Sequence, residues 1–499
     1  MRRWGYVAGE IHHRIGQGAF MRGQKPVVLA AAVVTSLCLG AGVAAAGNDG
    51  WSAPKPGSDG AGDSYYPQDG NGGYDVADYN LKVGYDPASH QLTGAQDITA
   101  RATQALSSFN LDLHGLTVDS VQVDGRGAKF SRTGDHELVI TPSRPLRRGE
   151  RFEAKIAYHG VPAAIQDPAL GANGWQFAQA GGAFAAGEPK SATTWYPVND
   201  TPRDKATFHL AITVPDEWGV IANGREKPSH KAPGGGTTHV WAEETPIVPY
   251  MTTVAIDKWT FDRQKRADGT PIVSAFAPGV PDSTKQAEAR LPEVLDFLES
   301  KFGKYPIDAA GGIFLNEEIG FSLETMSRPI YSAGWAGNLP TIVHENAHQW
   351  YGDSVAVDHW RDVCLNECFA SYATWLWDEA KEGVDLNKQY ADDVKKASTA
   401  FWNGKLYDMG AGREFTSVYS KGPMMLHALR SYVGQAAFDR VLKTWPSLHR
   451  DGNASMQDFQ HYTELVAHKN LKGFFDAWVY GAGKPADQYL FPGGLKPAA

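Results

Sequence analysis

The stretch that decides the fold runs from Thr341 to Tyr372 and reads TIVHENAHQWYGDSVAVDHWRDVCLNECFASY. Within it, His344 and His348 are four positions apart, and residues at this spacing lie on one face of a helix. Pro340 suits the first turn of such a helix, and Gly352 suits its end. The sequence therefore predicts a short helix that presents two imidazoles on the same side.

A carboxylate follows these histidines on a second predicted helix: Glu367 stands nineteen positions after His348. Two imidazoles and one carboxylate, with water in a fourth position, are typical of a catalytic zinc site rather than a closed structural one. Glu345, beside the first histidine, is then free to act on that water. The His-Glu-x-x-His pattern alone also arises by chance on amphipathic helices, and it is the distant Glu367 that favours zinc.

HENAHQW followed by WRDVCLNECFASY resembles the zinc site of the aminopeptidase N and leukotriene A4 hydrolase family of zinc metallopeptidases, the gluzincins. The resemblance implies one zinc ion held by His344, His348 and Glu367, with Glu345 as general base on zinc-bound water. It extends from about residue 74 to 483 and leaves out the large helical C-terminal domain of many relatives. We therefore expect a secreted bacterial-type member that lacks this domain.

Composition and charge set the broad class of the protein. The chain has 499 residues, of which 42% are hydrophobic and 21% charged, as is typical of a globular protein with two or three domains. The formal net charge of -9 provides no basic surface for nucleic acid, so we expect no nucleic-acid partner.

The first 46 residues are typical of an export signal. Arg22 and Lys25 precede an apolar run, and Ala44 to Ala46 offers a cleavage site of small residues. We expect residues 1–46 to be a signal peptide, with Met21 as an alternative start, and the mature protein to be secreted, whether released or retained at the cell surface. A membrane anchor is the alternative, because the apolar run could almost span a bilayer. Its Ala and Gly content favours cleavage, with no stable membrane insertion afterwards.

Two further features concern order and pairing. Residues 47–73 are rich in Gly, Pro, Ser and Asp, a composition that cannot build a core, and they predict a flexible linker. Beyond the signal, the cysteines are Cys364 and Cys368. Side chains four apart on one helix hold their Cβ atoms too far apart for an easy disulfide, so we favour two buried thiols beside Glu367. Whether they pair is left open.

From about Tyr74 the sequence alternates between apolar and polar residues. Alternating runs begin at Tyr79, Phe109, Phe152 and Phe208, and they are separated by Gly, Asp and Pro. Such short runs predict an antiparallel sheet with one buried face. By themselves they indicate no activity.

The alternation ends near Tyr250 to Trp259, and helical periodicity begins at Ser283 to Phe302. We therefore expect an α+β multidomain protein. Residues 74–260 would form an N-terminal antiparallel β domain, which is saddle-like in the family. Residues 261–499 would form the catalytic domain, which the resemblance implies is thermolysin-like and mostly helical.

Three more residues take roles through the resemblance. The segment from Lys190 to Thr207 is similar to a family segment that places Glu188 on the β domain as a substrate-binding residue. GFSLETMSRPIY stands where the family has Gly-x-Met-Glu-Asn and keeps only the glutamate, Glu324, so fine specificity is open. SVYSKG resembles the family's Tyr-x-Lys-Gly segment and assigns Tyr419 a catalytic role. By composition alone, Glu188 is an exposed loop acid and Tyr419 a core tyrosine.

Together these features predict a zinc-dependent aminopeptidase that removes single residues from the free N-termini of peptides. Tyr419 would stabilise the oxyanion, while Glu188 and Glu324 would hold the substrate's α-ammonium. The alternatives are a zinc endopeptidase or a non-peptide hydrolase on the same centre, and a catalytically silent surface-binding relative. The preferred N-terminal residue, the natural substrate and the oligomeric state are open.

Overall fold

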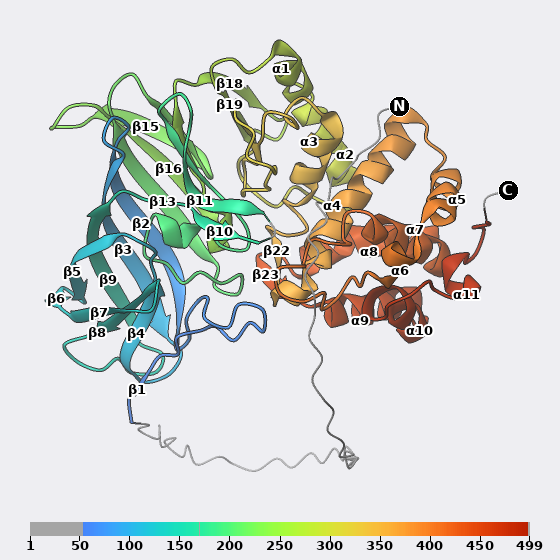
Figure 1. Cartoon of the computed structure of the whole chain (residues 1–499), viewed down its shortest axis with the longest axis horizontal. Coiled ribbons are helices and arrows are strands. Elements are labelled where there is room, and N and C mark those ends of the chain that lie inside the picture. Colours follow the sequence, from blue (N-terminus) through green and yellow to red (C-terminus); the bar gives the residue numbers. More distant parts are fainter. Residues whose placement is uncertain (1–52, 169, 498–499) are drawn as a thin grey trace, which may run out of the picture. The chain divides into compact units, whose positions relative to one another are not determined.

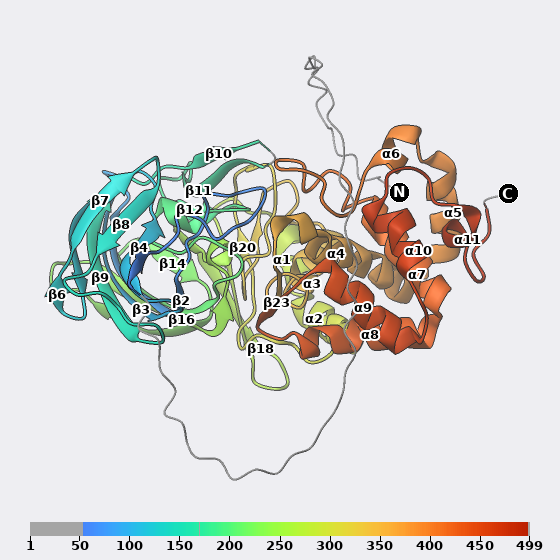
Figure 2. The same ribbon diagram turned by 90° about the horizontal axis from the view of Figure 1, so that it is seen from below.

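Strands fill the first half of the folded chain, and helices fill most of the second half (Figure 1). The computed structural model describes residues 53–168 and 170–497, which fall within one compact unit. The β-rich region and the helical region lie side by side in both views (Figure 2). The predicted order, a β domain followed by a mostly helical catalytic region, is confirmed.

The largest sheet carries the predicted alternation. Along β2, for example, Tyr79, Leu81, Val83 and Tyr85 are all buried, and their neighbours are more exposed. The eight strands, in spatial order, are β15 (Arg225–Lys231), β16 (Thr237–Ile247), β13 (Ala206–Val214), β2 (Tyr74–Asp86), β3 (Gln91–Ala102), β9 (Arg151–Gly160), β5 (Thr117–Val123) and β6 (Arg126–Gly127).

We predicted an antiparallel sheet, but β13 runs parallel to β2. Alternation shows which face of a strand is buried, but it carries no information about the direction of the neighbouring strand. The chain returns to β2 only after a long excursion through other strands, and such a connection allows parallel pairing.

Two smaller sheets complete the β-rich region. One contains β1 (Lys55–Pro56), β4 (Leu106–Asp112), β8 (Glu137–Thr141) and β7 (Lys129–Thr133). The other contains β10 (Ile165–Asp167), β11 (Gly171–Phe177), β12 (Ala183–Ala186), β17 (Val254–Asp257) and β14 (Gly219–Ala222). The next strand, β18, begins at Thr260 and joins a different sheet, and we place the border of the two regions between these strands.

The second region combines a small sheet with helices. Its strands are β18 (Thr260–Lys265), β19 (Pro271–Phe276), β20 (Ile313–Phe314) and β21 (Ile330–Tyr331), with a separate pair β22 (Val355–Val357) and β23 (Gly452–Ala454). Its α-helices are α1 (Asp282–Glu288), α2 (Leu291–Phe302), α3 (Leu339–Ala347), α4 (Cys364–Trp377), α5 (Leu386–Lys396), α6 (Thr399–Asn403), α7 (Lys421–Val433), α8 (Gln435–Leu448), α9 (Met456–Ala467), α10 (Lys472–Phe475) and α11 (Asp487–Leu490).

Residues 53–73, which we call the strap, are ordered on the surface of both regions. The hydroxyls of Tyr65 and Tyr66 donate hydrogen bonds to Asp408 and Glu414, both at 2.9 Å, and Asp63 accepts the backbone N–H of Trp360. The prediction of a flexible linker is therefore wrong for this part, while residues 47–52 lie outside the described residues. A segment too poor in apolar residues to build a core can still be held by polar contacts to an existing surface.

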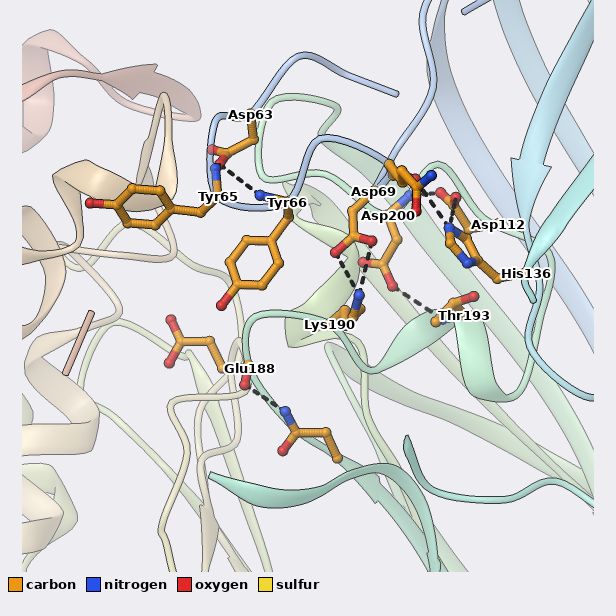
Figure 3. A network of polar contacts seen from close by, with 12 residues as sticks. Asp63, Tyr65, Tyr66, Asp69, Asp112, His136, Glu188, Lys190, Thr193 and Asp200 are labelled. Atoms are coloured by element: carbon orange, nitrogen blue, oxygen red, sulfur yellow. Dashed lines mark hydrogen bonds and ion pairs between the residues drawn. The ribbon is translucent and has the colours of Figure 1, made fainter. Parts of the chain in front are cut away.

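The strap also contacts the β-rich region. The side chain of Lys190 contacts Asp69 at 2.8 and 2.9 Å (Figure 3). The backbone N–H of Asn71 donates to the side chain of Asn199.

Cys364 and Cys368 form a disulfide, so the prediction of two buried thiols is wrong. Their Cα atoms are 4.8 Å apart, within the usual range for a disulfide. Cys364 is the first residue of α4, where the carbonyl oxygen of Val363 accepts the N–H of both Asn366 and Glu367, so the first turn mixes i→i+3 and i→i+4 bonding. The spacing rule for a regular helix interior therefore does not apply there. A Cβ at Gly422 would lie 2.5 Å from the sulfur of Cys368, so this glycine lets α7 pack against the disulfide.

Buried side chains cross-link the two regions. Lys205, just before β13, donates to the carbonyl oxygens of Asp353 and Ser354 at 2.8 and 2.9 Å. The guanidinium of Arg328, fully buried, donates to Ala222 at 2.9 Å and to Val273 at 3.0 Å, which lie in β14 and β19 respectively. The regions therefore share an interior.

The predicted signal peptide, residues 1–46, lies outside the described residues. Within residues 53–168 and 170–497, no helix is long and apolar enough to cross a membrane.

Candidate metal centre

The predicted helix is present as α3, which carries His344 and ends directly before His348. Together with the start of α4 it brings the three predicted ligands together. The Nε2 atoms of His344 and His348 lie 3.2 Å apart. Oε2 of Glu367, from the first turn of α4, lies 3.2 Å from the first of these atoms and 3.5 Å from the second. Three ligand atoms thus converge on one point from two helices.

This arrangement fits a zinc ion. Atoms that lie 2.0–2.1 Å from one tetrahedral ion are about 3.3–3.4 Å from one another, close to the three distances between these side chains. Nδ1 of His348 lies 3.0 Å from the carbonyl oxygen of Tyr351, which can only accept, so Nδ1 carries the proton. In the neutral ring, Nε2 then presents a lone pair to the shared point, as a metal ligand must.

The loop after α3 keeps His348 in place. Gly352 has φ +137°, and a Cβ at this position would lie 3.3 Å from Nδ1 of His348. Most other residues would be strained by this backbone conformation and would crowd the ring. Gln349, on the other side, accepts the backbone N–H of Ser327 at 2.7 Å and so fixes the segment that carries Glu324.

Three more acids surround the triad. Oxygen atoms of Glu324 and Glu345 and a ring nitrogen of His348 lie within 4.8 Å of one another, as do oxygens of Glu188, Glu324 and Glu367. Glu188 and Glu324 are each 2% exposed. Each also has one carboxylate oxygen without a hydrogen-bond partner among the described residues.

Glu188 is buried, whereas its composition alone suggested an exposed acid in a loop. The residue precedes Pro189 and is held from behind by Asn173, whose side-chain N–H donates to the Glu188 carbonyl oxygen at 2.6 Å. Glu324 follows Leu323, which forms an isolated bridge with Ile330.

These acids make the site strongly attractive to cations. Burial raises the pKa of Glu188, Glu324 and Glu345, and neighbouring carboxylates raise it further. Burial alone would lower the pKa of His348, but the carboxylates of Glu324 and Glu367 outweigh it and raise that pKa well above its ordinary value. Burial likewise opposes ionisation of Glu367, yet the charge of His348 and hydrogen bonds from the histidines lower its pKa to about 2. A site with this surplus of buried carboxylates is stabilised by bound positive charge.

Tyr419 lies two residues before the first residue of α7. Its ring centroid is 6.0 Å from that of His344, and the residue is partly buried. It therefore borders the metal centre.

Sequence reasoning missed Glu414. This acid is 1% exposed, accepts the hydroxyl of Tyr66, and raises the pKa of Glu188 by its charge. The only hint in the sequence was its position five residues before Tyr419, because nothing indicated that the strap would fold over it.

Comparison with known proteins places both regions in one family. Residues 76–251 match the Peptidase M1 N-terminal domain, and residues 336–478 match the Peptidase family M1 domain, which contains the three candidate ligands. The chain belongs to peptidase family M1. The predicted kinship with aminopeptidase N is thereby confirmed, and zinc is the metal that M1 membership implies.

Named relatives are similar at a modest level. The M1 chain is 24% identical to mouse glutamyl aminopeptidase over 323 residues, which cover 60% of this chain and 34% of that protein. It is 24% identical to aminopeptidase N of Lactococcus lactis over 451 residues, covering 82% of this chain and 50% of the relative. The M1 chain thus spans about a third to a half of the length of these curated relatives.

Solved structures match over their whole length. The M1 zinc metallopeptidase of Deinococcus radiodurans has a TM-score of 0.80 and 28% identity, and the match covers 88% of this chain and all of that one. A substituted form of the same enzyme, bound to a Tyr-Ser-Ala substrate, also gives a TM-score of 0.80, with 86% of this chain and 99% of that chain covered.

Proposed function

We propose that this M1 protein is a zinc-dependent aminopeptidase that removes single residues from the free N-termini of peptides. The observation that carries the proposal is the pair Glu188 and Glu324 beside the converging triad of His344, His348 and Glu367. Both acids are buried, and each has one oxygen with no hydrogen-bond partner in the described part of the chain. Such acids favour a cationic group of the substrate, and a peptide has one at its N-terminus.

His344, His348 and Glu367 would hold the zinc ion. When bound there, zinc supplies Lewis acidity, which makes water more acidic and polarises a carbonyl oxygen. Glu345 would take a proton from the attacking water and later deliver it to the leaving amine. A carboxylate oxygen of Glu345 and a ring nitrogen of His348 lie within 4.8 Å of each other. The proposed base is therefore close to the metal ligands but is not one of them.

The other side chains would act on the substrate. The hydroxyl of Tyr419 would donate a hydrogen bond to the oxyanion that forms at the scissile carbonyl. Glu188, from the β-rich region, and Glu324, from the helical region, would bind the α-ammonium and so fix the distance from the N-terminus to the bond that is cut. Cleavage would then be limited to the first residue.

We expect the enzyme to require a free amine. An acetylated peptide leaves two buried carboxylates unpaired, which costs about 1–3 kcal/mol for a polar group and more for charges, so its kcat/KM should fall at least about tenfold. Cleavage should also decline as the pH rises past about 7.7–8.0, where a model α-amino group loses its proton. The measurement is kcat/KM on a peptide and on its N-acetylated form.

Two variants test whether the buried acids cause the requirement for a free amine. Glu324→Ala should lose most of the preference for the free amine, whereas Glu318→Ala, an exposed acid of the same segment between β20 and β21, should keep it. Equal cleavage of the two peptides by the parent enzyme, or cuts at internal bonds, would indicate an endopeptidase. If the enzyme turned over no peptide, the remaining alternatives would be a non-peptide hydrolase or a catalytically silent relative.

We expect Tyr419→Phe to lower kcat by about 10²–10³ with zinc content and KM little changed, because it removes one oxyanion donor. Tyr432→Phe is a matched control, since Tyr432 lies near the other end of α7 and stacks on Phe474. Steady-state kinetics and metal analysis of the two variants test the role. A change in KM alone would make Tyr419 a uniform binding contact instead.

We also propose that the protein is exported through the signal at residues 1–46. The support is the sequence alone: a basic start, an apolar run and small residues at its end. Mass spectrometry of the N-terminus of protein recovered from outside the producing cells tests it.

A further inference from the structure

A second cluster of metal-ligating side chains lies in the β-rich region, where β4 meets β8. Asp112, the last residue of β4, pairs directly with Glu137, the first residue of β8, and His136 precedes Glu137 in the chain. Like charges in directly opposed positions on neighbouring strands destabilise a sheet. This pair therefore needs a partner of opposite charge.

Both carboxylates are buried and lack sufficient partners. Asp112 is 1% exposed; its Oδ2 accepts the N–H of Asp200 at 2.8 Å, but its Oδ1 makes no hydrogen bond within the described residues. Glu137 is 8% exposed, and neither of its oxygens has a hydrogen-bond partner in that same part of the chain. A buried carboxylate with no compensating contact is costly.

His136 completes the cluster. One ligand atom from each of Asp112, His136 and Glu137 lies within 4.8 Å of the other two. Nε2 of His136 is 3.8 Å from Oδ1 of Asp112 and 3.1 Å from the carbonyl oxygen of Gln68 in the strap. Figure 3 shows the imidazole turned toward the Asp112 carboxylate. One imidazole and two carboxylates are a donor set for zinc or manganese.

Two members of the cluster, Asp112 and His136, line a cavity of about 210 Å³ together with Asp200 and other residues. This cavity has more negative than positive charge around it. The amine that lines it, Lys190, already contacts Asp69. Arg132 donates to the carbonyl oxygens of Leu113 and Leu116, and its charge lowers the pKa of Glu137 without outweighing burial. Burial, together with neighbouring acids, raises the pKa of Glu137 to about 7 and that of Asp112 well above its ordinary range.

We propose that Asp112, His136 and Glu137 bind a divalent transition-metal ion, with zinc as the probe, at a structural site separate from the peptidase centre. The ion would neutralise the opposed carboxylates and join β4 and β8. Ligation through Nε2 of His136 would replace the hydrogen bond from this nitrogen to the carbonyl oxygen of Gln68 in the strap.

The test is the zinc content of the full-length protein after loading with Zn²⁺ and removal of free metal. We expect two ions in the parent, one in Glu137→Gln and one in His348→Ala, and none in the double variant. Peptidase activity of Glu137→Gln should equal that of the parent. Loss of a residue that only contacts a metal ligand typically lowers metal affinity 10–100-fold. Because Glu137 would itself be a ligand, Glu137→Gln should lower the zinc affinity of this site by more than that.

His209→Ala is the control for adventitious binding. His209 also contacts two carboxylates, Asp78 at 2.7 Å and Glu244 at 3.5 Å, but through opposite ring nitrogens, so they do not converge. This variant should keep both ions. If Glu137→Gln does not fold, His136→Ala, at a partly exposed side chain, replaces it.

One ion in the parent, unchanged in Glu137→Gln, would overturn the second site. One ion that is lost in Glu137→Gln but kept in His348→Ala would support this site and instead refute the zinc ligands of the proposed peptidase.

Discussion

Replacing His348 with alanine should remove one zinc ion and essentially all peptidase activity. Nε2 of His348 lies 3.2 Å from that of His344 and 3.5 Å from Oε2 of Glu367, so its loss leaves only two of three converging ligands. Even outer contacts to metal ligands are worth 10–100-fold in affinity, and a ligand itself should be worth more. Metal analysis and turnover on an aminoacyl amide should fall together.

The control is another buried histidine. His427 on α7 is 2% exposed and is held by Tyr372 and Asn387, away from the triad. His427→Ala removes a buried imidazole without removing a ligand, so any loss of stability should not be accompanied by loss of zinc. A chelator should also inactivate the parent, and zinc should restore it. Stoichiometric zinc at the triad with full turnover in His348→Ala would refute the ligand assignment.

Glu345→Gln should keep the fold and the zinc yet lose about 10²–10⁴ in kcat, the usual contribution of a positioned general base. The amide has nearly the same shape as the carboxylate but no basic oxygen. Glu345 lies on α3 directly after His344 and is 6% exposed, so a substitution that preserves its shape should leave the helix unchanged. Steady-state kinetics, metal content and the melting temperature test the three parts of this expectation.

A buried glutamate elsewhere provides the matched control. Glu288 is 2% exposed, and burial raises its pKa to about 8, so it is mostly uncharged at pH 7. Its Oε1 accepts the hydroxyl of Ser274 at 2.6 Å. Glu288→Gln makes the same chemical change away from the metal centre and should keep full activity. Turnover of Glu345→Gln within a few-fold of the parent would remove Glu345 from the mechanism.

The sequence predicted the parts of the molecule that are encoded by local spacing. The four-residue interval between His344 and His348 predicted their shared face, and the apolar alternation from Tyr79 to Tyr85 predicted the buried face of β2. Both depend only on the repeat of a helix or a strand, which is constant along the element. The family resemblance then pointed to Glu188 and Glu324, which the fold brings together from two regions.

The features that the sequence did not predict depend on what lies next to a segment. The strap has no core of its own, and its order comes from partners such as Glu414, 348 positions away from Tyr66. The disulfide depends on the tightened start of α4, which spacing alone does not encode. The pairing of Asp112 with Glu137 depends on the register of β4 and β8. None of these is visible in a local window of residues.

The contacts of Lys205 and Arg328 bear on how members of the family could be recombined. Lys205 donates to two carbonyl oxygens a few residues after His348, and Arg328 donates to Ala222 and Val273 on opposite sides of the border. A chimera joined between β17 and β18 would keep these hydrogen bonds only where the foreign backbone brings its carbonyl oxygens to the same places. The two regions are therefore best exchanged between relatives together, because they share an interior.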